Sequence, residues 1–139
     1  MRNTLGIVMA VLAFACAPAM GASMSKQDYK AAKKRIAEEY LAERQKCGVR
    51  YGNALDLCVA HAHAARDVAK AELEAAYKPK PRAYYNAAIA RAKSGYTVAK
   101  EECDYKRGAE KKTCRKDAKV AFDRARAEAK TALARGDLK

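Results

Sequence analysis

Apolar residues recur at helical spacing in four segments of the chain. Between residues 85 and 103 the steps alternate between four and three, which marks one stripe along a helix. This stripe consists of Tyr85, Ile89, Ala92, Tyr96, Ala99 and Cys103, and an equivalent earlier one of Tyr29, Ile36, Tyr40 and Cys47. Two further segments carry small residues, namely Cys58, Ala62, Ala65 and Ala69, then Cys114, Ala118, Ala121 and Ala125. Small residues let helix axes approach to about 8 Å, so the pattern predicts an all-α fold of closely paired helices.

The two halves of the chain are copies of each other. A gapless shift of 56 residues gives 14 identities over the 47 positions from 29 to 75, including two cysteines, two tyrosines and one glycine. Between the copies stands Lys78-Pro79-Lys80-Pro81, and prolines interrupt helices. We therefore predict two tandem αα-hairpin repeats, residues 23–78 and 83–139, joined by a short stiff linker at residues 79–82. The hairpins could pack together or be joined semi-rigidly.

Local signals predict where the helices begin and end. Gly52-Asn53 and Gly108-Ala109 mark the turns, with glycine in the left-handed conformation that ends a helix and Asn53 as the next N-cap. Ser25 with Asp28 resembles the start of the first helix, and Gly136 would end the last one. Helix-weakening residues make the third helix the least regular in our prediction; these are Asn86, Ser94 and Gly95.

The chain begins with the features of a secretory leader. Arg2 precedes an unbroken apolar run from residue 5 to residue 15, and small residues follow. This order predicts a signal peptide at residues 1–22 and a periplasmic or secreted protein; the run is too short to span a bilayer. Cys16 leaves a lipoprotein as an alternative, although Phe14 does not fit the usual lipidation site. Without Cys16 four cysteines remain, as expected for paired thiols in an oxidising compartment.

Two disulfide arrangements are compatible with the spacing of these four cysteines. Cys47 and Cys58 could share one face of a long helix and bond to Cys103 and Cys114 on a facing helix. Alternatively, each hairpin could be closed by its own disulfide, because each cysteine lies five residues from the centre of its turn. Antiparallel helices would bring such positions to the same height. We therefore predict Cys47–Cys58 and Cys103–Cys114 as structural bonds, while cross-repeat pairing stays open.

No catalytic or metal-binding motif stands out. His61 and His63 diverge by about 200° on a helix, so they cannot chelate one ion, and we interpret them as solvated. The cysteine spacing matches neither a redox motif nor a zinc knuckle. The tyrosine stripe is interpreted as core and the interleaved carboxylates as a solvated helix surface. The sequence therefore predicts a protein that is not an enzyme and has no cofactor or metal.

Charge is the informative asymmetry. The whole chain has a net charge of +13. Residues 23–78 hold 11 basic and 8 acidic side chains, whereas residues 79–139 hold 17 and 8. We predict an anion-binding surface on the second hairpin, formed by Lys106, Arg107, Lys112, Arg115, Lys116 and Lys119. The alternative is that these residues only keep the protein in solution. Clustered cations attract polyanions with strong salt dependence.

The cysteine–glycine spacing carries a resemblance. Cys-x-x-x-x-Gly-Asn-Ala-x-Asp-x-Cys at 47–58 and Cys-Asp-x-x-x-Gly-Ala-x-x-x-x-Cys at 103–114 resemble uncharacterised Ala/Lys-rich secreted helical-repeat proteins of Gram-negative bacteria. Gly48 departs from that pattern, which often has Asp there, and the second copy lacks Asn after its glycine. The resemblance implies periplasmic or secreted helical repeats and carries no activity with it.

Three functional hypotheses follow. The first is a non-enzymatic binding or structural protein whose second hairpin contacts an anionic envelope component, such as lipopolysaccharide phosphates or anionic lipid, or an acidic protein. Nucleic acid is a less favoured partner. The second hypothesis is a periplasmic holdase-type chaperone that uses a basic helical cradle, and the third is an enzyme.

Overall fold

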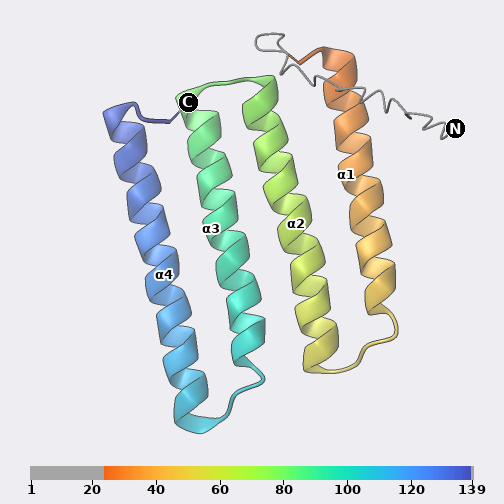
Figure 1. Cartoon of the computed structure of the whole chain (residues 1–139), viewed down its shortest axis with the longest axis vertical. Helices are drawn as coiled ribbons and strands as arrows, with labels where there is room; N and C mark the ends of the chain where they lie inside the picture. The colour runs from red at the N-terminus through yellow and green to blue at the C-terminus, as the bar shows by residue number, and fades with distance from the viewer. Residues whose placement is uncertain (1–23, 139) are drawn as a thin grey trace, which may run out of the picture.

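The computed structural model describes residues 24–138 and consists of four antiparallel helices in a row (Figure 1). They are α1 (Lys26–Cys47), α2 (Asn53–Tyr77), α3 (Pro81–Cys103) and α4 (Gly108–Arg135). The prediction of an all-α fold built from two hairpins is confirmed. The predicted leader at residues 1–22 and Cys16 lie outside the described residues. No helix within residues 24–138 is both long and apolar enough to cross a bilayer.

The helices form a single layer rather than a closed bundle. Each helix contacts only its neighbours in sequence, α1 with α2, α2 with α3, and α3 with α4 (Figure 1). The most extensive of these contacts joins α2 to α3, so the two hairpins pack together. As a result, α1 and α4 form the two edges of the layer, and both of its broad faces are open.

The core between these helices is thin and made mostly of alanine. The buried apolar residues are Ala32, Cys47, Ala60, Ala62, Leu73, Ala75, Ala87, Cys103 and Ala129. Leu73 is the one large aliphatic side chain among them. Alanine is the best helix former and allows close approach of helix axes, but it buries little apolar area. The layer therefore depends on additional covalent support.

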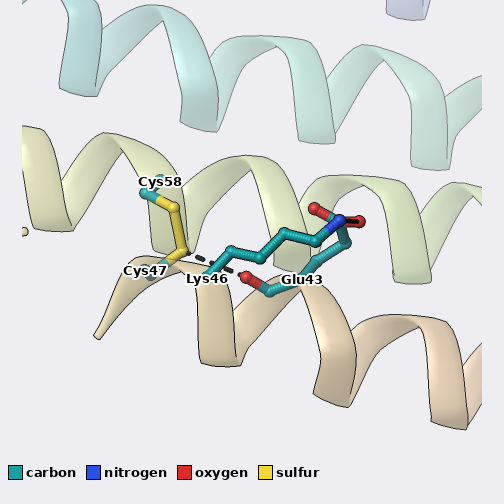
Figure 2. The surroundings of a disulfide bond; sticks show 4 residues. All are labelled: Glu43, Lys46, Cys47 and Cys58. Carbon is teal, nitrogen blue, oxygen red and sulfur yellow. Dashed lines mark hydrogen bonds and ion pairs between the residues drawn. A yellow bond between two sulfur atoms is a disulfide. The ribbon is translucent and has the colours of Figure 1, made fainter. Parts of the chain in front are cut away.

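That support comes from one disulfide in each hairpin, as predicted. Cys47 bonds to Cys58 and Cys103 to Cys114, with Cα separations of 5.7 and 5.6 Å. Each bond joins the last residue of one helix to the first turns of the next. Figure 2 shows the first of them, where the Cys47 sulfur also lies 3.4 Å from the carbonyl oxygen of Glu43. The cross-repeat alternative is excluded by this pairing.

The helix ends confirm some of the predicted signals and correct others. The hydroxyl of Ser25 accepts a hydrogen bond from the Asp28 amide, and Gly136 ends α4 in the left-handed conformation, both as predicted. Gly52 and Gly108 have φ angles of +55° and +52°, but they start the following helices instead of ending the preceding ones. Asn53 is the first residue of α2 and not its cap. Its side-chain amide instead donates a hydrogen bond to the other hairpin.

The predicted linker at residues 79–82 is longer than the observed connection. The non-helical segment spans only residues 78–80, because Pro81 is already the first residue of α3. Proline suits this position, where no amide hydrogen bond is lost and its φ angle matches the helix. Pro79 therefore ends one hairpin and Pro81 begins the next.

The prediction of an irregular third helix is wrong, since α3 runs without interruption from Pro81 to Cys103. Ser94 is buried, and Gly95 lines a shallow hollow between α2 and α3. Both residues are small, and both lie where the two hairpins meet. Their low helix propensity is offset by tertiary packing, which dominates helix stability in proteins.

Removing a disulfide should cost a large part of the stability of this thin-cored protein. We expect the Cys47→Ser/Cys58→Ser variant to lose about 2–3 kcal/mol of unfolding free energy, because the unfolded chain regains the freedom of a short loop. Urea unfolding followed by circular dichroism measures this loss. The Cys103→Ser/Cys114→Ser variant should lose a similar amount. Unchanged midpoints in both variants would contradict a stabilising role.

The contact between the hairpins should not tolerate larger residues. Ala87 is 2% exposed and lies on the side of α3 opposite to Cys103, which faces α4, so it faces α2. We expect Ala87→Leu to destabilise the protein by about 1–3 kcal/mol through overpacking. Ala31→Leu, on an exposed position of α1, is the matched control and should be close to neutral. Equal thermal midpoints for the two variants would mean that the hairpins do not pack as described.

Candidate anion-binding face

One broad face of the layer is hollowed and lined by small residues. A hollow of about 500 Å³ between α2 and α3 is lined by Ala64, Ala65, Val68, Ala69, Ser94, Gly95, Val98 and Ala99, with polar residues at its rim. A second hollow between α3 and α4 is lined by Ala99, Ala118, Ala121 and several carboxylates, which are Glu102, Glu110 and Asp117. We call this side the hollow face. It is apolar at its floor and does not carry the excess of positive charge.

The excess positive charge of the second hairpin lies on the opposite face. Successive residues of an α-helix are rotated by about 100°, so a residue two positions from one that lines the hollow points the other way. Lys119 stands in this relation to both Asp117 and Ala121, which line the hollow. Lys112 and Arg115 precede it by seven and four residues and share its side of α4. All three side chains are exposed. We call this side the basic face.

The basic face is longer than the sequence analysis predicted. Arg126 and Lys130 follow Lys119 at steps of seven and four, so they continue the same stripe toward the end of α4, and both are exposed. On α3, Lys93 and Lys100 are also seven residues apart and so share one side of the helix. Lys93 lies two positions from Arg91 and Gly95, and Lys100 lies two positions from Val98 and Glu102. These four residues line the hollow face, so both lysines point to the basic face. These residues lie outside the dense run of charge that ends at Lys119, and only the helical register of the stripe indicates them.

Two stacked aromatic rings organise the middle of this face. Tyr96 of α3 and Phe122 of α4 lie with ring centroids 5.1 Å apart and planes inclined by 15°. Three cations surround the pair: Lys100 lies 4.9 Å from the centre of the Tyr96 ring, and Arg126 and Lys119 lie 5.3 and 6.0 Å from that of Phe122. Attraction between a cation and an aromatic ring holds such side chains near the ring. The rings therefore keep cations from two helices together.

Carboxylates neutralise only part of this charge. Lys119 forms an ion pair with Asp123, and the Arg126 guanidinium lies 3.9 Å from the same residue. Arg115 donates to the carboxylate of Asp104 at 2.6 Å. Lys112 and Lys130 have no ion pair within the described residues. The face thus combines seven cations with two carboxylates, Asp104 and Asp123.

The first hairpin does not repeat this stripe. The residues of α2 that correspond to Lys112, Arg115, Lys119, Arg126 and Lys130 are Asp56, Val59, His63, Lys70 and Glu74. The aromatic centre is conserved in part, because Tyr40 lies 5.1 Å from the ring of His63 and 4.6 Å from the guanidinium of Arg66. The copies therefore share an architecture, whereas the continuous positive stripe belongs to the second hairpin.

Three of the six predicted anion-binding residues lie elsewhere. Lys106 lines the second hollow on the hollow face, and Arg107 is the N-cap of α4, in the turn. Lys116 is one turn from Lys112 and seven residues before Asp123, so it lies at the border between the basic face and the free edge of α4. Lys112, Arg115 and Lys119 are brought together as predicted. The dense run of charge in the sequence is thus divided by the helix between a face, an edge and a turn.

The two turns at this end of the layer are tied to each other. The side-chain amide of Asn53 donates to the carbonyl oxygen of Asp104 at 2.8 Å, which joins the α1–α2 turn to the α3–α4 turn. The Asp104 carboxylate in turn accepts from Arg115 and lies 3.1 Å from the Lys111 ammonium. These two cations, Arg115 foremost, hold the pKa of the Asp104 carboxyl below its ordinary value. Asp104 therefore connects the two hairpins through its backbone oxygen and binds the start of α4 through its carboxylate.

The histidines and carboxylates form no metal site in the described part of the chain. His61 lines the hollows beside α2, and His63 lies 3.3 Å from the Tyr40 hydroxyl, so their side chains diverge as predicted. Tyr29 hydrogen-bonds to Glu74 and stacks on Tyr77, with centroids 4.2 Å apart, which closes the far end of the first hairpin. The hydrogen bond to Glu74 raises the pKa of Tyr29.

Comparisons with known proteins found no matching family model, no similar curated protein and no similar solved structure.

The ion pairs of Asp104 should be visible in its titration. We expect its carboxyl to titrate below the ordinary value, so the stability it contributes is present above the unfolded pKa of about 3.9 and is lost as the pH falls through the lower folded value. Arg115→Gln should move the folded pKa up toward the ordinary value. NMR titration of the carboxyl carbon measures both values. Arg124→Gln, which removes a cation beside Glu128, is the control and should leave Asp104 unchanged. An unperturbed Asp104 carboxyl in the unmutated protein would contradict its ion pairs with Arg115 and Lys111.

Proposed function

We propose that the protein is an exported, non-enzymatic binding protein that holds a polyanionic component of the cell envelope against the basic face of its second hairpin. The observation that carries this proposal is the stripe of Lys112, Arg115, Lys119, Arg126 and Lys130 on α4, with Lys93 and Lys100 beside it on α3. From Lys112 to Lys130, 18 residues further along α4, the stripe spans about 27 Å of helix, long enough for several phosphate or sulfate groups.

The shape of the face supports an extended ligand. The layer is one helix thick, and the hollow on this side, of about 330 Å³, is lined by Lys33, Lys70 and Glu74 of the first hairpin and not by the stripe on α4. A small molecule would therefore find little enclosure at the stripe. Small-molecule sites are normally concave and largely apolar. A polyanion, in contrast, binds by releasing counterions along its length and needs only a row of accessible cations. The basic face offers such a row.

An exported location is part of the proposal. Two disulfides persist in oxidising compartments such as the periplasm and the extracellular medium, and residues 1–22 have the order of a secretory leader. Lipopolysaccharide phosphates and anionic lipid headgroups are the polyanions of that compartment. An acidic protein or exported nucleic acid offers the same type of charge and would be an alternative partner.

The holdase alternative was predicted to use a basic helical cradle, but the hollows and the basic stripe lie on opposite faces of the layer, so an apolar client would have to bind the hollow face. A chaperone of that type binds unfolded chains through exposed apolar surface. The floor of the hollow face is apolar, but it is lined mainly by alanine, glycine and valine, with Leu57 and Tyr105 as larger side chains beside the start of α2, and carboxylates stand at its rim. It therefore offers little apolar area to an unfolded client. We favour polyanion binding for this reason. Suppressed aggregation of an unfolded client would reverse this preference.

Charge reversal tests the face against a matched position on the same helix. Arg126 belongs to the basic face, whereas Arg124, two residues earlier, points to the hollow side. We expect Arg126→Glu to weaken binding to a heparin oligosaccharide. The slope of log K against log salt concentration should decrease in magnitude by about one, because one ionic contact is lost. Arg124→Glu changes the net charge equally and should behave nearly like the unmutated protein. Fluorescence anisotropy with a labelled oligosaccharide over a salt series gives both quantities.

A double variant extends the test to the contrast between hairpins. Lys112→Glu/Lys130→Glu on the basic face should weaken retention on heparin far more than Lys33→Glu/Lys34→Glu on α1, although the net charge change is the same. If both pairs of variants behave alike, binding follows net charge only and the proposed face is a solvated surface.

A further inference from the structure

The layer ends in two neighbouring turns that expose large apolar side chains. Five large apolar residues are exposed in the described part of the chain, and three of them lie in these turns. Val49 is 82% exposed and Tyr51 84%, both in the α1–α2 turn; Tyr105, in the α3–α4 turn, is 54% exposed. The other two, Leu41 and Val120, lie singly on helices. Scattered apolar residues need no explanation, but a cluster at one end does.

The two turns form one structural unit, which we call the stapled tip, residues 48–52 and 104–107. The amide of Asn53 bonds to the Asp104 carbonyl oxygen, and Arg50 and Tyr105, one from each turn, line the same hollow beside the start of α2. Both turns lie at the same end of the helices (Figure 1). Directly behind each turn lies a disulfide, and backbone hydrogen bonds from Arg50 to Cys47 and from Lys106 to Cys103 close the loops.

The tip is also positively charged. Arg50, Lys106 and Arg107 are exposed and form no ion pair within the described residues. The acidic residue of the tip, Asp104, is already engaged by Arg115 and Lys111 of α4. Two of these cations, Lys106 and Arg107, belong to the predicted anion-binding surface but lie in the turn before α4, away from the basic face. The tip thus presents apolar and cationic side chains together.

We infer that the stapled tip inserts shallowly into the headgroup region of an anionic lipid bilayer. Tyrosine is favoured at this depth because its ring is apolar and its hydroxyl reaches water, and arginine and lysine pair with anionic headgroups. Three cations at the surface of such a membrane increase partitioning by roughly fivefold each. The headgroup layer is hydrated, so the turn backbone needs no further partners there.

The geometry of the tip favours a lipid surface over a folded partner. Val49 and Tyr51 are exposed at the end of a narrow layer, so they form a convex surface. A fluid headgroup layer can deform around such a surface, whereas a folded partner would need a matching concave site. The disulfides and backbone hydrogen bonds hold the loops in place before contact, which reduces the conformational entropy lost on binding. This inference is independent of the basic face, because it uses the end of the layer and not its side.

A single tryptophan at the tip reports insertion directly, since the protein has none of its own. We expect the disulfide-bonded Tyr51→Trp variant to shift its emission to shorter wavelength on vesicles of phosphatidylcholine with about one-third phosphatidylglycerol. Lipids brominated in their acyl chains should quench it. The Val120→Trp variant carries the reporter on the side of α4, at a position 59% exposed, and should show neither change. Vesicles of phosphatidylcholine alone should give a much smaller shift.

A second pair of variants separates the tip from the basic face. Val49→Asp/Tyr51→Asp should reduce binding in vesicle co-sedimentation by roughly tenfold or more through lost apolar transfer and added negative charge, while heparin binding stays within twofold. Leu41→Asp is the exposed control on α1. The proposed insertion is overturned if the Tyr51→Trp emission does not change or changes no more than that of Val120→Trp. It is equally overturned if the double variant binds vesicles as the unmutated protein does, or if the protein does not bind these vesicles at all. Loss of heparin binding in the Arg126→Glu variant concerns the basic face only.

Discussion

Alanine at the helix contacts is the constraint on which the rest of the structure depends. Alanine side chains allow neighbouring helices to approach closely, and they supply helix propensity along the whole chain. They also bury little apolar area, so the contact between two helices is weak for its length. The four described helices have no further apolar surface wide enough to recruit a distant neighbour, so each packs only on the helices next to it in sequence. A single layer results, with almost no interior.

Disulfide bonds supply stability that the small buried apolar area of this architecture does not. Each one closes its hairpin at the turn, where α1 meets α2 and α3 meets α4, and among residues 24–138 Cys47 and Cys103 are the most completely buried side chains. A cross-link that constrains the unfolded chain substitutes for the apolar area that alanine does not provide. The same bonds order the turns beyond them. Stability and the shape of the tip therefore have one origin.

The fold was predictable because its signals are local and repeated. Tyr40 and Cys47 recur 56 residues later, the cysteines stand symmetrically about each glycine, and together these features indicate the hairpins and their bonds. The role of Asn53 was not predictable, because it depends on the other hairpin: Asn53 donates to Asp104 instead of capping its own helix. The regularity of α3 depends in the same way on α2. Likewise, a dense run of charge in sequence does not show which residues share a face; Lys106 and Lys119 are close in sequence but lie on different sides.

The duplication separates what the fold needs from what the surfaces do. Positions that both copies retain include the cysteines, Gly52 and Gly108, and small residues such as Ala62 and Ala118. Positions that differ include the contact between the hairpins, where the buried Ala60 corresponds to Lys116 at the opposite edge of the layer. They also include the open faces and the turns, where Asp56 corresponds to Lys112, Glu74 to Lys130, and Val49 to Tyr105. A thin core restricts few residues, and each exposed position can change at little cost in stability. Charge could therefore accumulate on one face of one copy while the shared scaffold stayed the same, which is the distribution expected if the surfaces carry the function and the interior only presents them.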